Sequence, residues 1–190
     1  MLRAAADRRR PGGIALRIVG IDPGIAICGF GMIDHAGGAA RPAALAYGVW
    51  RTRGGSDAAR LRVLYDEVCR LLAAHRPDAA AVERLYHNRN VSSAASVGQV
   101  RGVVLLALAQ QEVPVAEYTP TAVKAAVTGY GGADKRQVQL MVAAQLGLDA
   151  VPRPDDAADA LGLCLCHLLG QGLRDRVAAA SRRAAGGETR

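Results

Sequence analysis

Up to residue 118, the chain contains several short, nearly continuous apolar runs bounded by polar turns, a pattern typical of strands buried in a sheet. The pattern predicts strands over residues 16–22, 25–33, 43–50, 79–83 and 113–118. Pro23-Gly24 interrupts the first pair, so the chain is expected to turn there and return as an antiparallel strand. A glycine-rich turn around Gly37-Gly38 separates the second pair.

Segments with apolar residues at helical spacing lie between and after these strands. Residues 57–75 carry one apolar stripe, and further helices are predicted over 92–111, 120–128, 134–146 and from Asp155 to about Leu169. Thr119-Pro120 supplies an N-cap and a first-turn proline for the third of these helices. The order βββαβαβααα predicts one α/β domain, a mixed five-stranded sheet with helices on both faces.

Charge divides the 190 residues into three parts, although the whole chain carries +7. Residues 1–15 hold four arginines and one aspartate and are interpreted as a basic, flexible N-terminal arm. Residues 171–190 hold five arginines and two acids, and their Ala, Gly and Arg-rich composition predicts a disordered tail. The body, residues 16–170, carries only +1, so the basicity on its own fits solvated ends as well as a nucleic-acid partner.

Composition excludes several classes of protein. No apolar run reaches the roughly 18 residues that span a bilayer, and residues 1–13 lack the apolar core of a secretory signal. Four cysteines (Cys28, Cys69, Cys164, Cys166) show no CxxC or disulfide spacing, which favours a reducing compartment. Cys164, Cys166 and His167 cannot converge on one metal from a helix, so they are predicted to be core residues. A soluble, cytoplasmic protein without a membrane partner is expected.

Carboxylates stand where the predicted elements meet. Asp22 and Glu83 each end a strand, and a right-handed crossover through the 57–75 helix would make these strands parallel neighbours. Asp156 and Asp159 are three residues apart, so both project from one face of the last helix's first turn. A single acid at such a place is usually a turn or cap residue. Four that converge indicate a site.

Four carboxylates in one concavity repel one another unless cations bind. An oxygen-only donor set selects Mg²⁺ or Mn²⁺. Two such ions can activate a water and stabilise the departing oxygen of a phosphodiester, so metal-dependent phosphodiester hydrolysis is predicted.

From about Arg17 to Leu169 the chain resembles the RuvC family of Holliday junction resolvases in the ribonuclease H-like superfamily. The motifs that carry the resemblance are residues 20–24 (GIDPG), Glu83 with an aromatic three residues later, 98–102 (GQVRG), 123–124 (VK), 134–139 (DKRQVQ) and 156–161 (DAADAL). Each motif is weak alone, but together, in this order and spacing, they are specific. The pattern favours Asp156 over the adjacent Asp155 as the third acid.

The resemblance implies a crossover junction endodeoxyribonuclease whose catalytic metal ligands are Asp22, Glu83, Asp156 and Asp159, with two Mg²⁺ per active site and Mn²⁺ as a substitute. It implies paired symmetric nicks in four-way junction DNA that leave 5′-phosphate and 3′-hydroxyl ends, in DNA recombination and repair. A homodimer and the RuvA–RuvB branch-migration complex are the implied protein partners.

Two regions are predicted to contact DNA. The loop after Glu83 surrounds an aromatic with donors and cations (Arg84, Tyr86, His87, Arg89, Asn90). Tyr86 stands where similar resolvases place a wedge, commonly Phe, and could stack on an unpaired base; packing under its own loop is the alternative. His87 is either a surface residue or a DNA contact. Lys124 and Lys135 match family lysines linked to DNA binding and activity, and Arg136 lies beside them at a helix start.

Some features stay open at this point. Residues 129–135 superficially resemble a P-loop but follow a helix and lack the Gly-Lys-Ser/Thr ending, so no nucleotide cofactor is predicted. Arg101 is either structural or functional, and the 92–111 helix either joins a dimer interface or is buried in the core. An actin-like phosphotransferase and a non-catalytic junction-binding protein are the rival functions; the first lacks room for a second domain, and the second needs no set of four acids.

Overall fold

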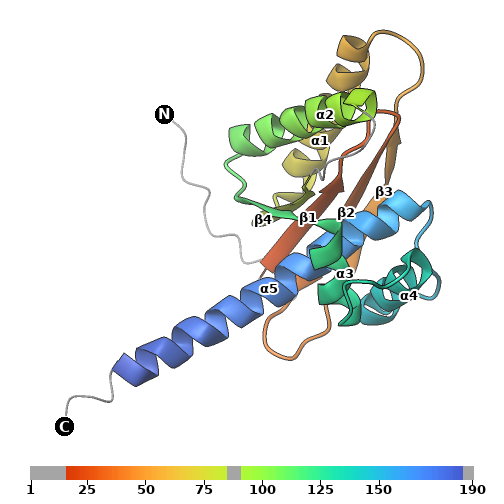
Figure 1. Cartoon of the computed structure of the whole chain (residues 1–190). Coiled ribbons are helices and arrows are strands. Elements are labelled where there is room, and N and C mark those ends of the chain that lie inside the picture. The colour runs from red at the N-terminus through yellow and green to blue at the C-terminus, as the bar shows by residue number, and fades with distance from the viewer. Residues whose placement is uncertain (1–15, 85–90, 186–190) are drawn as a thin grey trace, which may run out of the picture.

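The computed structural model describes the backbone of residues 16–84 and 91–185, and the side chains of the same residues except 91–94 and 173–185. Five strands form one sheet in the order β3-β2-β1-β4-β5. Their bounds are β1 Leu16–Asp22, β2 Ile27–His35, β3 Ala43–Arg51, β4 Ala79–Glu83 and β5 Val115–Tyr118. β1 pairs with β2, and β2 with β3, in antiparallel register, whereas β1 with β4 and β4 with β5 are parallel. The mixed sheet that the sequence predicts is therefore present (Figure 1).

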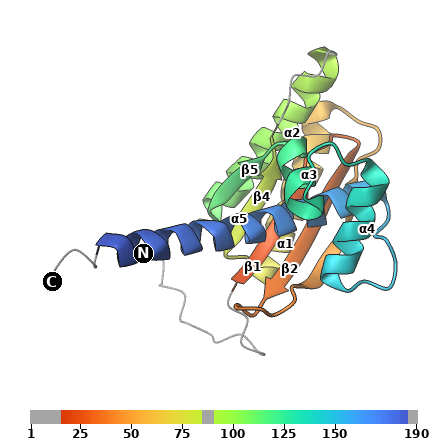
Figure 2. The same ribbon diagram turned by 60° about the horizontal axis from the view of Figure 1, so that its bottom comes forward.

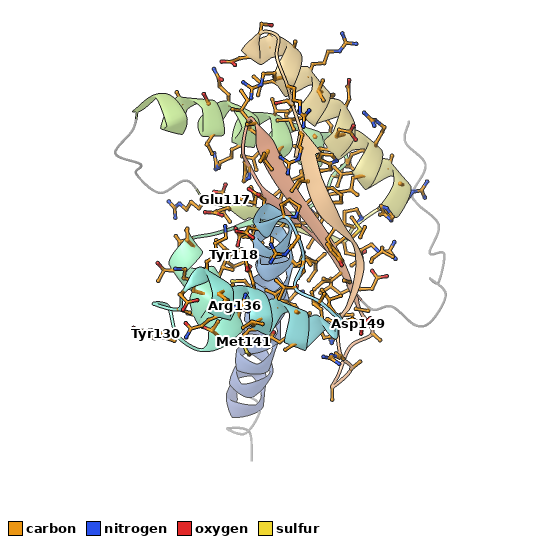
Figure 3. All side chains as sticks on the ribbon, turned by 90° about the vertical axis from the view of Figure 1, so that its right-hand side faces the viewer. Glu117, Tyr118, Tyr130, Arg136, Met141 and Asp149 are labelled. Carbon is orange, nitrogen blue, oxygen red and sulfur yellow. The ribbon has the colours of Figure 1, made fainter. Side chains whose placement is uncertain are left out.

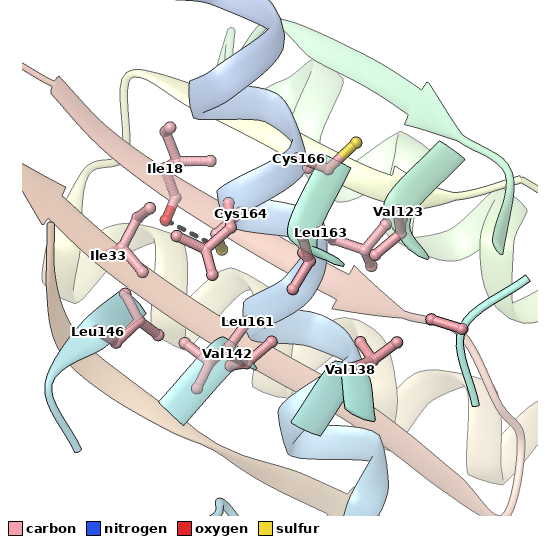
Figure 4. Close-up of a cluster of buried hydrophobic side chains, with 14 residues drawn as sticks. Ile18, Ile33, Val123, Val138, Val142, Leu146, Leu161, Leu163, Cys164 and Cys166 are labelled. Atoms are coloured by element: carbon pink, nitrogen blue, oxygen red, sulfur yellow. Dashed lines mark hydrogen bonds between the residues drawn. The ribbon is translucent and has the colours of Figure 1, made fainter. Parts of the chain in front are cut away.

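Helices cover both faces of this sheet, as Figures 1 and 2 show. Their bounds are α1 Asp57–His75, α2 Val91–Gln110, α3 Pro120–Thr128, α4 Lys135–Leu146 and α5 Asp155–Ala185. α1 and α2 pack on one face, where Val19 and Ile21 of β1 are fully buried. α3, α4 and α5 pack on the other face around Ile18, Ile33 and Leu161 (Figure 4). Alternate residues of β1 thus enter two separate cores, as expected for a strand covered on both sides.

Capping side chains define where the helices begin. Ser56 accepts a hydrogen bond from the Ala59 amide at the start of α1, and Thr119 does the same for α3. Asp134 and Gln137 form a reciprocal capping box at the start of α4. The capping box fixes the start of α4, so Lys135 is the first residue of this helix. At this position its side chain can reach neighbouring loops and helices.

The predicted element order is confirmed, but some boundaries differ by more than one residue. β2 begins and ends two residues later than predicted, and β5 starts at Val115 because Pro114 precedes it. α5 continues to Ala185 instead of ending near Leu169, so residues 171–185 are helical where composition predicts disorder. Alanine and arginine, which dominate this segment, are strong helix formers, and the packed first half of α5 supplies the nucleus that a helix needs. In Figure 1 this end of α5 projects beyond the sheet.

Candidate active site

Two neighbouring strands bring the first pair of carboxylates together. In the parallel pairing of β1 with β4, Ile21 lies opposite Val82, so the next residues, Asp22 and Glu83, end the two strands side by side. Their carboxyl groups are close enough to share a hydrogen bond. The predicted adjacency of Asp22 and Glu83 is therefore present in the structure.

Glycines on the strands let the first turn of α5 lie directly on the sheet. A Cβ atom built on Gly29 of β2 would lie 2.2 Å from the Asp156 carbonyl oxygen, and one on Gly20 of β1 would lie 2.0 Å from the Ala160 oxygen. Only a residue without a side chain fits such an approach to backbone atoms. Ala157 and Ala160 are fully buried on the helix side of the same contact. This close packing brings Asp156 and Asp159 to the end of β1.

Burial and mutual repulsion perturb these carboxyl groups. Burial, then the charges of Glu83 and Asp159, the hydrogen bond with Glu83 and the charge of Asp156 raise the pKa of Asp22 to about 8. Burial also raises the pKa of Glu83, although the hydrogen bond from Asp22 opposes the shift. For Asp159, burial raises the pKa more than the nearby Lys135 lowers it. These neighbouring carboxyl groups repel one another when ionised, so the binding of a cation between them is strongly favoured.

One ammonium group already lies among these acids. Lys135 Nζ is 3.3 Å from Asp159 Oδ2 and 3.4 Å from Asp155 Oδ2. Burial lowers the pKa of Lys135, but the two aspartates more than offset it, so the pKa is raised and the side chain stays charged. Lys135 therefore bridges Asp159, a predicted metal ligand, and Asp155, which is not a predicted ligand.

A hollow of about 210 Å³ lies beside the carboxylates. Glu83, Asp159, Lys124 and Lys135 provide its charged lining, and Pro120, Val123, Val138 and Leu163 provide the apolar part. Two carboxylates and two lysines around one hollow match the needs of a phosphodiester group, whose oxygens bind cations while the acids hold metals or protons.

The acids are suited to a metal in their chemistry but are not arranged as a coordination sphere. Among the side chains that the structure describes, no three His, Cys, Asp or Glu residues are positioned to hold a metal ion. Asp159 is turned to Lys135 and Asp22 to Glu83, so binding requires these side chains to exchange partners. The donor set itself, four carboxylates from three elements with raised pKa values at three of them, fits hard divalent cations.

The other residues that the sequence singles out fall into four groups. Lys124 and Lys135 line the hollow. Arg136, the second residue of α4, and Arg84, the residue after β4, are exposed. Tyr86, His87, Arg89 and Asn90 lie outside the described residues. Arg101 forms an ion pair with Glu117 of β5, which supports the structural alternative for it.

The cysteines and His167 behave as core residues. Cys28, Cys164 and Cys166 are buried. The Cys164 thiol contacts the carbonyl oxygen of Ile18 (Figure 4) and also that of Gly31. His167 is buried with its Nδ1 atom 2.9 Å from the Tyr118 hydroxyl. The prediction that Cys164, Cys166 and His167 are core residues is confirmed by their burial.

Two contributions to the site are absent from the sequence-based prediction. Gly20 and Gly29 set the distance between α5 and the sheet; the signal was glycine inside predicted strands, which often marks a close backbone approach. Asp155 forms a second ion pair with Lys135, in addition to that of Asp159. Nothing in the sequence distinguishes this contact from ordinary capping of α5.

Comparison with known proteins agrees with this geometry. The family model described as crossover junction endodeoxyribonuclease RuvC matches residues 18–167. The RuvC protein of Brevibacillus brevis is 50% identical over 153 residues, which cover 80% of this chain and 91% of the relative. That of Chloroflexus aggregans is 52% identical over 153 residues, covering 80% and 92%.

Solved structures give the same result. Thermus thermophilus RuvC in complex with a Holliday junction substrate has a TM-score of 0.78 and 37% identity, with 82% of this chain and 94% of that chain covered. The yeast mitochondrial Holliday junction resolvase, at 13% identity and a TM-score of 0.59 over 87% and 86% of the two chains, shares the fold. Within the described residues, no helix is long and apolar enough to cross a membrane.

Proposed function

The chain belongs to the RuvC family of crossover junction endodeoxyribonucleases, and from this premise we propose that it resolves four-way DNA junctions by metal-dependent hydrolysis of paired phosphodiesters. The observation that carries the proposal is the convergence of Asp22, Glu83, Asp156 and Asp159 beside a hollow lined by two lysines. Cleavage in recombination and repair would leave 5′-phosphate and 3′-hydroxyl ends that a ligase can seal.

The four carboxylates are the proposed ligands of two Mg²⁺ ions, for which Mn²⁺ can substitute. When bound, such ions supply an activated water and stabilise the departing oxygen. The protein's own contribution is rigidity, because Asp22 and Glu83 sit on adjacent buried strands and Asp156 and Asp159 on a helix packed on glycines. Side chains on such rigid elements lose little conformational freedom when they bind metal ions.

Lys124 and Lys135 bind and orient the DNA in this proposal. Both line the hollow beside Glu83 and Asp159, so their ammonium groups meet the phosphate that enters it. Lys135 releases Asp159 when that carboxylate is recruited, and Asp155 then keeps the ammonium close to the site. The lysines thereby compensate the charge of the phosphodiester backbone next to the acids. Arg84 and Arg136, both exposed, extend this cationic surface.

Two symmetric nicks need two active sites, so we propose a homodimer related by a two-fold axis. α2 supplies a surface for it. One side of α2 is in the core, where Val100, Val104 and Leu108 are fully buried. Exposed positions on the other side follow a four-and-three spacing: Ala95, Gln99, Gly102, Leu106 and Ala109. Leu106 is 53% exposed, and nothing lies within 4 Å of a Cβ placed on Gly102. This is the spacing of a helix-packing seam.

Two further partners and a compartment complete the proposal. The RuvA–RuvB branch-migration complex is the proposed protein partner, and the cytoplasm the proposed location. Free cysteines suit that reducing compartment. Tyr86, Arg89 and Asn90 remain predicted DNA contacts outside the described residues, and the basic N-terminal arm predicted over residues 1–15 also lies outside them.

The test is cleavage of a labelled four-way junction and of a linear duplex with the same sequence, in Mg²⁺ and in EDTA. The proposal expects nicks at matching positions on two opposite strands of the junction only, in Mg²⁺ only, with ends that ligase seals. Junction binding without nicks in Mg²⁺ or Mn²⁺ would favour the non-catalytic alternative. ATP turnover without nicks would favour the phosphotransferase.

A further inference from the structure

The loop between α3 and α4, residues 129–134, presents an aromatic ring to solvent. Tyr130 is 68% exposed, more than any other large apolar side chain among the described residues. Figure 3 shows it at the outer side of this loop, beyond Arg136. Sequence comparison with nucleotide-binding loops offers no role for this glycine-rich segment. An exposed aromatic on an ordered loop is a common feature of binding surfaces.

The backbone of Tyr130 is held on both of its polar groups. The Thr128 hydroxyl lies 3.2 Å from the Tyr130 amide nitrogen and 3.0 Å from its carbonyl oxygen. The Ala133 amide also donates to that carbonyl at 3.1 Å. Gly129, with φ of 78°, ends α3 in the left-handed conformation and turns the chain into the loop. The exposed ring is therefore carried by a fixed backbone, which reduces the entropy cost of binding.

The ring itself is also positioned. A Cβ atom on Gly132 would lie 2.6 Å from Cζ of Tyr130, so the ring lies across a glycine that has no side chain to displace it. Gly131 seats the loop on α3, where its Cβ position is 3.0 Å from Thr121 Cγ2. Part of the ring thus rests on the protein while most of it faces outward.

Cationic residues flank this ring in the sequence. Lys135 and Arg136 follow it at the start of α4, and Lys124 belongs to the last turns of α3, where the Thr128 hydroxyl also contacts its carbonyl oxygen at 2.8 Å. Lys135 also lines the hollow beside the carboxylates. A ligand that contacts both Tyr130 and Lys135 would therefore be part of the substrate that enters this hollow. A ligand with phosphates for the cations and flat or apolar groups for the ring is a nucleic acid strand.

We propose that Tyr130 binds the substrate DNA, with its ring packed against a nucleotide of the junction while Lys135 and Arg136 bind the flanking phosphates. This inference rests on the proposed function and adds a DNA contact on the α3–α4 side of the active site. A tyrosine contact of this kind carries no charge, so its loss weakens binding equally at all salt concentrations.

The experiment measures junction affinity in EDTA, where no cleavage occurs, at four salt concentrations for wild type and variants. Tyr130→Ala is expected to weaken binding by about 5-fold to 150-fold, the range for loss of one base–aromatic contact, with an unchanged slope of log affinity against log salt. Tyr130→Phe keeps the ring and is expected to bind within about 2-fold of wild type. Tyr47→Ala removes another exposed tyrosine, on β3, and serves as the matched control.

Lys135→Gln calibrates the assay, because loss of one phosphate contact reduces the slope by about 0.9. The inference is overturned if Tyr130→Ala binds like wild type. It is also overturned if the slope falls with Tyr130→Ala, because the loop would then act only by placing the cations. Failure of wild type to bind the junction would contradict the proposed function itself.

Discussion

Replacement of Asp22 by Asn should separate catalysis from folding, because the same carboxylate is needed for the reaction and costly for the metal-free fold. Asn is nearly isosteric with Asp, carries no charge, and can still donate a hydrogen bond to Glu83. The substitution should abolish cutting and, without metal, stabilise the protein.

The magnitude follows from the pKa of Asp22, which rises from 3.8 to about 8 on folding. A carboxyl with a raised pKa contributes full stability below its unfolded value and loses it as the pH rises through the folded value. At pH 7 the Asp22 carboxyl is still protonated in the folded protein, about 3 pH units above the pKa that it has in the unfolded chain. At about 1.36 kcal/mol per unit, this lowers the free energy of unfolding by about 4 kcal/mol. Relaxation of the neighbouring acids reduces this cost. Asp22→Asn should therefore raise the free energy of unfolding of the metal-free protein by about 1–4 kcal/mol.

Thermal unfolding in EDTA at pH 5 and pH 8 tests this expectation. For a chain of this size, each kcal/mol raises the melting temperature by about 2–4 °C. Asp22→Asn should therefore melt several degrees above wild type at pH 8, with a smaller difference at pH 5, whereas the exposed Asp149→Asn control should match wild type at both. Saturating Mg²⁺ should stabilise wild type more than the variant. An Asp22→Asn protein that is less stable than wild type in EDTA at pH 8 would refute the electrostatic account.

Three further substitutions test other parts of the account. Gly29→Ala places a Cβ against the Asp156 carbonyl, so it should destabilise by about 1–3 kcal/mol and lower the cleavage rate; a urea titration and a nicking assay check this, and an equal rate would contradict it. Leu106→Glu puts a charge in the proposed α2 seam, so sedimentation should show a monomer; a persistent dimer excludes that interface. Asp155→Asn should slow cleavage by no more than about 5-fold, because an exposed ion pair with Lys135 contributes about 0.2–1 kcal/mol; complete loss of cleavage would make Asp155 a metal ligand.

Much of the site could be predicted because its acids stand at the ends of elements. A strand that ends in Asp22 or Glu83 fixes the carboxylate at the carboxyl edge of a parallel pair, whatever else the chain does. The pairing of β1 with β4 bears this out. Asp156 and Asp159 follow from helical spacing in the same way. Local periodicity therefore determines which carboxylates share a side of the molecule.

Contacts that depend on tertiary distance could not be predicted. The pattern of α5 does not show that Gly29 and Gly20 touch its backbone, since a strand glycine is equally compatible with a bulge. The ion pair of Lys135 with Asp155 joins separate helices, and its length depends on how these helices pack. α5 runs past Leu169 because helix propensity outweighs the low hydrophobicity that predicts disorder there.

The most direct test of the central claim, that the four carboxylates act together as one metal-dependent cutting site, is the single-turnover rate of junction cleavage in Mg²⁺ by Asp156→Asn. We expect a loss of at least about 100-fold, as for removal of a group that acts on the transition state, with junction affinity in EDTA within about 3-fold of wild type. Asp149→Asn, an exposed acid in the loop before α5, should cut at the wild-type rate (Figure 3). Cleavage by Asp156→Asn at the rate of that control would contradict the account.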